Sequence, residues 1–170
     1  MSIRNELKKV KNHVEVPTVL QMEATECGAA CLAMILASYG SYIPLEQLRK
    51  DCGINRDGSR VSNINKAAGR NGLIAKAYCM EAEGLLDVKM TCIIHWNFNH
   101  FVVLEGFKKG NVYINDPAGG RRAITWEELD RAFTGVVLVY VPAPDFERQG
   151  VEPQLYKALT GRLKGSEFTL

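Results

Sequence analysis

The sequence contains one stretch that decides the fold: Cys27-Gly-Ala-Ala-Cys-Leu-Ala-Met-Ile-Leu-Ala-Ser-Tyr39, followed by Gly40. The stretch is rich in helix formers, and a glycine just past its end is a common helix stop. Apolar residues occur around nearly its whole circumference. This pattern predicts a helix buried in the middle of the domain.

Two shorter helices are expected after the central one. Pro44 is suited to the start of a helix that ends at Gly53. Ser59 or Ser62 can cap a further helix that ends at Gly72. The first half of the chain is therefore predicted to be helical.

After Gly72 the period of the apolar residues changes, and the segments that follow are typical of strands. The expected strands are residues 73–80, 91–97, 100–107, 111–116 and 136–141. A short helix is expected at residues 82–87. Another starts at Thr125, where Thr125-Trp-Glu-Glu128 forms a capping box, and stops at Gly135. Helices first and strands later predict an α+β fold, with an N-terminal helical subdomain packed on a C-terminal antiparallel sheet.

The composition of the 170 residues is that of a globular domain, with 46% apolar and 24% charged residues. A net charge of +2 argues against a nucleic-acid partner. The sequence has no apolar run of membrane-span length and no signal-peptide centre, so we expect a cytoplasmic location. Five cysteines, an odd number, suit a reducing compartment.

Three segments are expected along the chain. Residues 1–15 form a polar arm, residues 16–142 the domain, and residues 143–170 a linker with an amphipathic segment. Leu155, Leu159 and Leu163 share one helical face of that segment. It either packs on the domain or leads to a membrane-bound region.

Cys27 is the candidate nucleophile. It lies in the first turn of the central helix, where free backbone N–H groups and a partial positive charge favour a thiolate. Cys31 lies one turn further inside. Cys31, Cys52, Cys79 and Cys92 are expected to act as apolar packing groups.

His100 is the candidate base, and Asp116 is the residue expected to orient it. Residues 108–110 end in glycine and suit a three-residue hairpin loop. If Phe107 faces Asn111, then Val102 faces Asp116, and His100 and Asp116 are diagonal neighbours on one face. A slip of one residue would separate them. The alternative for Asp116 is a plain turn residue, and His13 is expected to be solvated.

Two further hypotheses concern the same residues. Gln21, six residues before Cys27, can supply a side-chain N–H beside the Cys27 N–H, and two such donors form an oxyanion hole. Alternatively, Cys27, Cys31, His95 and His100 could bind zinc. The spacing is unfavourable for zinc, because the second sulfur would be buried inside a helix.

The motifs Gln21-Met-Glu-Ala-Thr-Glu-Cys27-Gly-Ala-Ala-Cys31, His100-Phe-Val-Val-Leu104 and Asn115-Asp116-Pro117-Ala118 resemble the peptidase domain of bacteriocin-processing ABC transporters, the double-glycine leader peptidases. The resemblance spans about residues 15–142. It implies a papain-like fold with Cys27, His100, Asp116 and Gln21 as catalytic residues, and it requires no cofactor or metal. Glu26 stands where aspartate is common, and we expect no catalytic consequence.

The resemblance also implies a substrate and partners. The substrate would be a precursor peptide whose amphipathic helical leader is cut after Gly-Gly, Gly-Ala or Gly-Ser. Transmembrane and ATP-binding domains would follow in the same chain, which would place the peptidase at the inner face of the cell membrane. The alternatives are a leader-binding module without catalysis and a thiol acyltransferase on the same fold.

Overall fold

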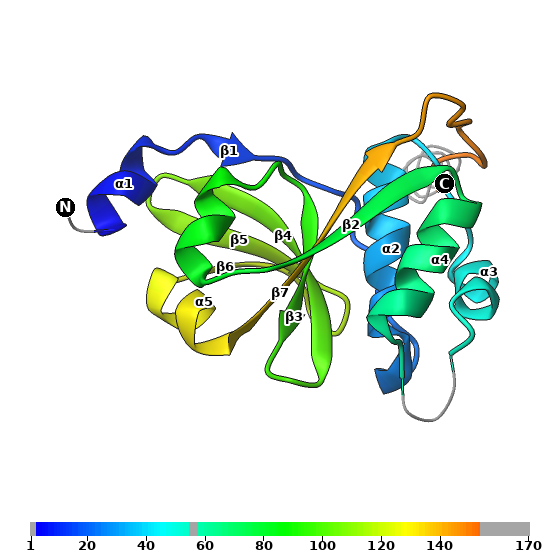
Figure 1. Ribbon diagram of the computed structural model, residues 1–170, viewed down its shortest axis with the longest axis horizontal. Coiled ribbons are helices and arrows are strands. Elements are labelled where there is room, and N and C mark those ends of the chain that lie inside the picture. The colour runs from blue at the N-terminus through cyan, green and yellow to red at the C-terminus, as the bar shows by residue number, and fades with distance from the viewer. Residues whose placement is uncertain (1–2, 55–57, 154–170) are drawn as a thin grey trace, which may run out of the picture.

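The computed structural model describes residues 3–54 and 58–153, which form a helical part beside a sheet (Figure 1). The helices are α1 (Ile3–Lys9), α2 (Cys27–Ser38), α3 (Leu45–Asp51), α4 (Val61–Arg70) and α5 (Trp126–Ala132), with 3-10 turns η1 (Ala24–Glu26) and η2 (Ala82–Asp87). The strands are β1 (Asn12–His13), β2 (Leu73–Cys79), β3 (Cys92–Trp96), β4 (His100–Lys108), β5 (Asn111–Asp116), β6 (Gly120–Ile124) and β7 (Phe133–Pro142). The predicted α+β class is confirmed.

The strands form one antiparallel sheet in the order β2-β7-β3-β4-β5-β6. The short strand β1 pairs with Gly106 and Phe107 of β4, beyond the part of β4 that pairs with β3. Strand β4 lies in the middle of this order, and its residues Phe101 to Phe107 are all buried. The middle of the sheet is therefore covered on both faces.

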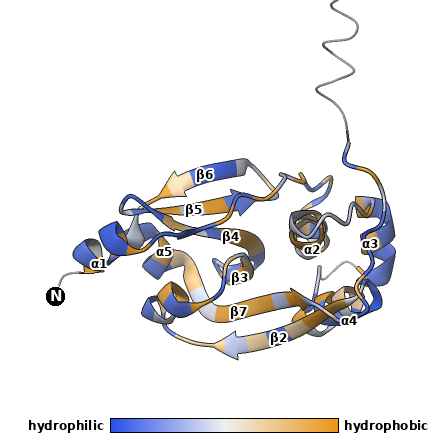
Figure 2. Cartoon of the chain, turned by 90° about the horizontal axis from the view of Figure 1, so that it is seen from above, coloured by the Kyte–Doolittle hydropathy of each residue, from blue (hydrophilic) through white to orange (hydrophobic). Residues whose placement is uncertain are grey.

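Helix α2 packs against one face of the sheet, and all its residues from Cys27 to Ala37 are buried. Figure 2 shows α2 end on, between β4 and α3. Phe101 and Val103 of β4 join the core around α2, while Val102 and Leu104 join the core on the other face. The predicted central helix is confirmed, and its surroundings explain why it has no polar side.

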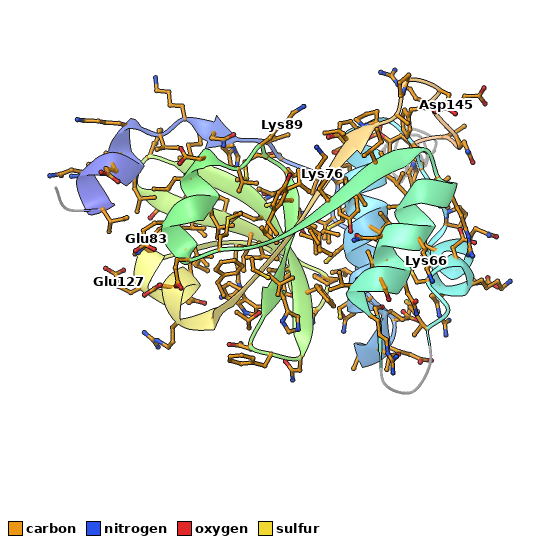
Figure 3. All side chains as sticks on the ribbon, viewed as in Figure 1. Lys66, Lys76, Glu83, Lys89, Glu127 and Asp145 are labelled. Carbon is orange, nitrogen blue, oxygen red and sulfur yellow. The ribbon has the colours of Figure 1, made fainter. Side chains whose placement is uncertain are left out.

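The outer faces of the elements carry the charge. Lys66 on α4, Glu83 on η2 and Lys89 are exposed and lie on the surface in Figure 3. None of the helices within residues 3–54 and 58–153 is long and apolar enough to cross a membrane. The expected amphipathic segment beyond residue 153 lies outside the described residues.

Several details of the sequence prediction are wrong at element ends. Arg60 precedes α4 without a side-chain cap, since the Ser59 hydroxyl bonds to the Thr25 carbonyl instead. Helix α5 stops at Ala132, not at Gly135, because Phe133 is already extended and pairs with Trp96 in the sheet. Tertiary pairing overrides the local helix signal there.

Three other residues or segments differ from expectation. Strand β6 was not predicted, because Gly120-Arg-Arg-Ala-Ile124 has little apolar alternation. Cys79 is exposed at the end of β2, so its predicted role as a packing residue is wrong. His13 is half-buried and not free in solvent as expected. It pairs with Gly106 in the sheet, and the centroid of its ring lies 4.8 Å from the centroid of the Tyr113 ring.

The β4–β5 hairpin differs from the predicted register at its loop and agrees with it further on. Lys108, not Phe107, faces Asn111, so the loop has two residues, Lys109 and Gly110, both with positive φ. Without a compensating shift, this change would have displaced every later residue pair of β4 and β5 by one position. The register shifts back between Leu104 and Gly106, and Val103 then faces Asn115 as expected. A β-bulge at Glu105 thus restores the alignment on which the candidate site depends.

The bulged residue, Glu105, is fully buried and has polar partners on all sides. Its Oε1 accepts hydrogen bonds from Val16 N (3.0 Å) and from the Asn115 side chain (3.1 Å). Its Oε2 lies 2.7 Å from Nε of Arg121. A buried carboxylate without such partners is strongly unfavourable. These partners therefore fix the bulge to β5, β6 and the N-terminal arm.

The next residue, Gly106, is the subject of a stability prediction. Its φ is +120°, and an added Cβ would lie 1.8 Å from the Asn12 carbonyl oxygen. We expect Gly106→Ala to lower the free energy of unfolding by about 3 kcal/mol, from backbone strain and the forced separation of β1. Urea unfolding measures this. Gly119→Ala is the matched control, since nothing lies within 4 Å of its added Cβ; equal losses in both variants would contradict the prediction.

Candidate active site

Cys27 is the first residue of α2 and lies beside an open cleft of about 510 Å³. Its side chain is nearly buried, with 4% of the residue exposed. The cleft is bounded by the η1 segment, the start of α4 and the turn between β3 and β4; its lining includes Thr25, Ser59, Arg60, His95 and Phe98. The thiol therefore lies beside this cleft at the start of a helix, where the helix dipole favours a negative charge.

His100 and Asp116 lie next to each other across β4 and β5. His100 Nε2 is 2.8 Å from Asp116 Oδ1, and both side chains are less than one fifth exposed. The Cys27 side chain lies close enough to the His100 ring to be the second-largest cause of the raised pKa of His100. The structure thus brings a thiol, an imidazole and a carboxylate together in one line of contacts, as the sequence predicted for these three residues.

Asp116 also forms a turn, as the plain-turn alternative predicted. Gly119 N donates to the Asp116 carbonyl (3.2 Å), with Pro117 at the second position of the turn. Ala118 N donates to Asp116 Oδ1 (2.8 Å). The turn fixes the carboxylate while leaving Oδ1 in contact with His100.

The neighbouring charges hold His100 in its protonated form. Hydrogen bonds to Asp116 and then to Cys27 raise the pKa of His100 to about 9, against the opposing effect of burial. Burial alone would raise the pKa of Asp116, but the His100 and Ala118 bonds outweigh it and the pKa is lowered. An imidazolium beside a thiol is the arrangement that nucleophilic thiol chemistry uses.

Cys31 and His95 lie close to the same centre but differ in character. Burial, followed by Cys27 and Asp116, raises the pKa of the Cys31 thiol well above its usual value, and that thiol donates to the Phe101 carbonyl (3.4 Å). Burial and the nearby His100 lower the pKa of His95. Cys31 is thus held as a thiol and His95 as a neutral imidazole. Cys31 can therefore serve as a control for Cys27, and His95 as a control for His100.

The zinc alternative is not supported by these contacts. In the part of the chain that the structure describes, no group of three or more His, Cys, Asp or Glu residues is placed to hold a metal ion. The His100 ring is already engaged by Asp116, and Cys31 by the main chain. The four residues of that hypothesis are not assembled as a ligand set.

Gln21 is tied to the loop that carries Asp116. Its backbone N–H donates to the Pro117 carbonyl (2.9 Å). Its side-chain Oε1 is buried, with no hydrogen-bond partner among the described residues. This buried acceptor oxygen has free capacity for a hydrogen-bond donor of a ligand.

Sequence reasoning missed two buried carboxylates, Glu26 and Glu105. Glu26 directly precedes Cys27, and Glu105 forms the bulge that aligns His100 with Asp116. The strand alternation around Glu105 includes Leu104 and Phe107, so a charged residue at a core position was the available signal. Glu26 stood out only as part of the family motif, because it lies in the short turn η1 and not in a strand.

The pH dependence of the reaction should follow from the raised pKa of His100. The imidazolium is present up to its pKa of about 9 and is lost above it. We therefore expect kcat/KM on a peptide substrate to fall on the alkaline side with an apparent pKa near that value. Asp116→Asn removes the largest cause of the raised pKa of His100, so the alkaline fall of kcat/KM should move to lower pH. A limb that stays in place would contradict the assignment.

The same shift affects folding stability. The folded pKa of about 9 is above the ordinary histidine value of 6.5. The stabilisation from His100 is therefore complete below about pH 6.5 and disappears as the pH rises through about 9.

Comparison with known proteins gives one consistent family. The model of the Peptidase C39 family matches residues 15–145. The chain is 39% identical over 157 residues to the probable microcin-H47 secretion/processing ATP-binding protein MchF of Escherichia coli, covering 91% of this chain and 22% of that protein. It is 37% identical over 156 residues to the colicin V secretion/processing ATP-binding protein CvaB of the same species. The chain thus spans about one fifth of the length of these relatives.

A solved structure gives the same result. The fold is similar to the crystal structure of a double glycine motif protease from an AMS/PCAT transporter in complex with the leader peptide. The TM-score is 0.76 at 55% sequence identity, and the match covers 78% of this chain and 96% of that chain.

Proposed function

Because the chain belongs to the Peptidase C39 family, a family of cysteine peptidases, we propose that it removes leader peptides from ribosomally made bacteriocin-type precursors. The cut follows a Gly-Gly, Gly-Ala or Gly-Ser pair. The observation that carries this proposal is the contact of the Cys27 thiol, the His100 imidazole and the Asp116 carboxylate beside an open cleft. The similarity to a double glycine motif protease solved with a leader peptide supports the substrate class.

In the proposed mechanism Cys27 attacks the carbonyl of the second small residue. His100, which is protonated below its pKa of about 9, forms an ion pair with the Cys27 thiolate, and Asp116 keeps the imidazolium oriented. The Gln21 side chain and the Cys27 N–H stabilise the oxyanion. His100 then protonates the leaving amine, and water hydrolyses the acyl-enzyme to release the leader with a free carboxylate.

The proposal extends to the place of the domain in a larger protein. Residues 16–142 act as the peptidase domain, and residues 143–170 connect it to transmembrane and ATP-binding domains in the same chain. The peptidase then works at the inner face of the cell membrane. The support comes from the relatives MchF and CvaB, each a secretion/processing ATP-binding protein about five times as long as the match.

The test of the proposal is mass spectrometry of a double-glycine precursor incubated with the protein. We expect two fragments separated after the small-residue pair. Binding without fragments would favour a leader-binding module. A leader carrying a hydroxamate, formed when hydroxylamine is added and competes with water, would favour an acyltransferase.

Gln21→Ala tests the oxyanion role. We expect turnover to fall by roughly 10²–10³-fold, the usual loss for one oxyanion donor. Steady-state kinetics on the precursor measures it, and KM should change little because the donor acts in the transition state. Met22→Ala is the matched control, since its side chain is 85% exposed. Near-normal turnover in Gln21→Ala would remove Gln21 from the site.

A further inference from the structure

The segment between Gln21 and Cys27 is held at both ends by groups that adjoin the candidate catalytic residues. At one end Gln21 N donates to the carbonyl of Pro117, the residue after Asp116 (2.9 Å). At the other end the chain enters α2 through the short turn η1, whose last residue is Glu26. The position of Gln21 relative to Cys27 depends on the shape of this turn.

Glu26 determines that shape with its side chain. Its carboxylate is fully buried and folds back over the turn. Oε2 accepts hydrogen bonds from Met22 N (2.8 Å) and Glu23 N (3.2 Å), the two residues directly after Gln21. One oxygen of Glu26, the residue before the nucleophile, thus binds the backbone directly after Gln21.

Arg49 of α3 compensates the buried charge. Its Nε lies 2.7 Å from Glu26 Oε1, and its side chain is 41% exposed. A buried carboxylate needs a paired cation and hydrogen bonds to remain ionised. The ion pair also anchors the turn to α3. The turn is thus fixed by Arg49, by its own backbone bonds to Glu26, and by the bond from Gln21 to Pro117.

The amide of Gln21 depends on this backbone arrangement. Its Oε1 has no hydrogen-bond partner among the described residues, so no bond of that atom fixes the side chain. The hydrogen-bonded main chain at residues 21–23 sets where this side chain begins, so a shift of the turn displaces the amide. A displacement of 1 Å at a reacting centre costs up to roughly 10²-fold in rate.

We propose that Glu26, neutralised by Arg49, is a positioning residue that holds the Gln21 amide at the oxyanion. This inference rests on the proposed peptidase function. It agrees with the expectation that glutamate in place of aspartate has no catalytic consequence, because both residues supply a carboxylate. The carboxylate does not touch the substrate and acts only through the turn.

The test compares Glu26→Gln with Glu26→Asp. Glu26→Gln keeps the size of the side chain but removes the charge and one acceptor, and we expect kcat to fall by roughly 10- to 100-fold with little change in KM. Glu26→Asp keeps the carboxylate and should retain most of the activity. The rate of Cys27 alkylation by iodoacetamide should not fall in either variant, because alkylation needs the thiolate but no oxyanion hole.

Two surface variants on α3 complete the experiment. Arg49→Ala leaves the Glu26 charge unpaired and should show the same loss of kcat with unchanged alkylation; it carries the test if Glu26→Gln does not fold. Glu46→Gln is the matched control, since Glu46 and its partner Lys50 are largely exposed, and it should behave as wild type.

Each outcome has a distinct meaning. Wild-type kcat in both Glu26→Gln and Arg49→Ala overturns the inference while the peptidase function stands. A parallel loss of alkylation and kcat also overturns it, because the role would then lie in the thiolate or in general stability. An inactive wild-type protein contradicts the proposed function instead.

Discussion

Cys27→Ala is expected to abolish precursor cleavage completely while leader binding survives. Without the sulfur no acyl-enzyme can form, and none of the neighbouring groups replaces it. Cys31, one turn along α2, has a pKa held well above its usual value by burial and bonds to the Phe101 carbonyl, so it is a poor substitute. Mass spectrometry over long incubations measures the residual rate, and calorimetry measures binding of the leader.

Cys31→Ala is the matched control for this experiment. It removes a thiol from the same helix, and we expect most of the activity to remain. The variant should lose some stability, because a fully buried side chain is shortened. Cleavage by Cys27→Ala above a trace, or complete loss in a folded Cys31→Ala, would move the nucleophile to another residue.

His100→Ala is expected to lower kcat/KM by roughly 10³–10⁴-fold, toward the upper end for a general acid–base group. The loss has two parts: the thiolate loses its imidazolium partner, and the leaving amine loses its proton donor. The variant should also need a higher pH for alkylation of Cys27, because the imidazolium with its pKa of about 9 no longer stabilises the thiolate. Stopped-flow alkylation across pH 5–10 measures this second effect.

His95→Ala is the matched control for His100→Ala, because it removes a histidine that lines the cleft but has no assigned catalytic role. His95 lines the same cleft as Cys27, but its Nδ1 is 2.7 Å from the Thr134 hydroxyl, and burial, followed by the nearby His100, lowers its pKa. We expect its pH profile of alkylation to resemble that of wild type. If His95→Ala shifts that profile and His100→Ala does not, the assigned base is wrong.

Much of the molecule follows from the sequence because the responsible patterns are local. The stretch from Cys27 to Tyr39 forms a buried helix, since it offers no polar face to solvent. The apolar run that follows His100 gives a strand buried on both faces. Cys27 at a helix start and Asp116 before a proline turn are likewise local features, visible without any knowledge of the fold.

Other elements depended on distant partners. Strand β6 forms because Gly120 to Ile124 pairs with β5, despite its polar sequence. Phe133 leaves the helix because Trp96 pairs with it in the sheet. Cys79 is exposed because β2 is at the edge of the sheet, which its composition does not reveal.

The sequence by itself therefore determined the α+β class, the buried helix and which residue types could act together. Only the tertiary structure decided that His100 and Asp116 meet. The loop shifts the hairpin by one residue, and the bulge at Glu105 shifts it back. That bulge is held by Arg121, Asn115 and the N-terminal arm, with Gly106 beside it where no Cβ fits. The physical reason is that side chains alternate with period two along a strand, so the face that Asp116 shares with His100 depends on the bulge at Glu105 in the neighbouring strand.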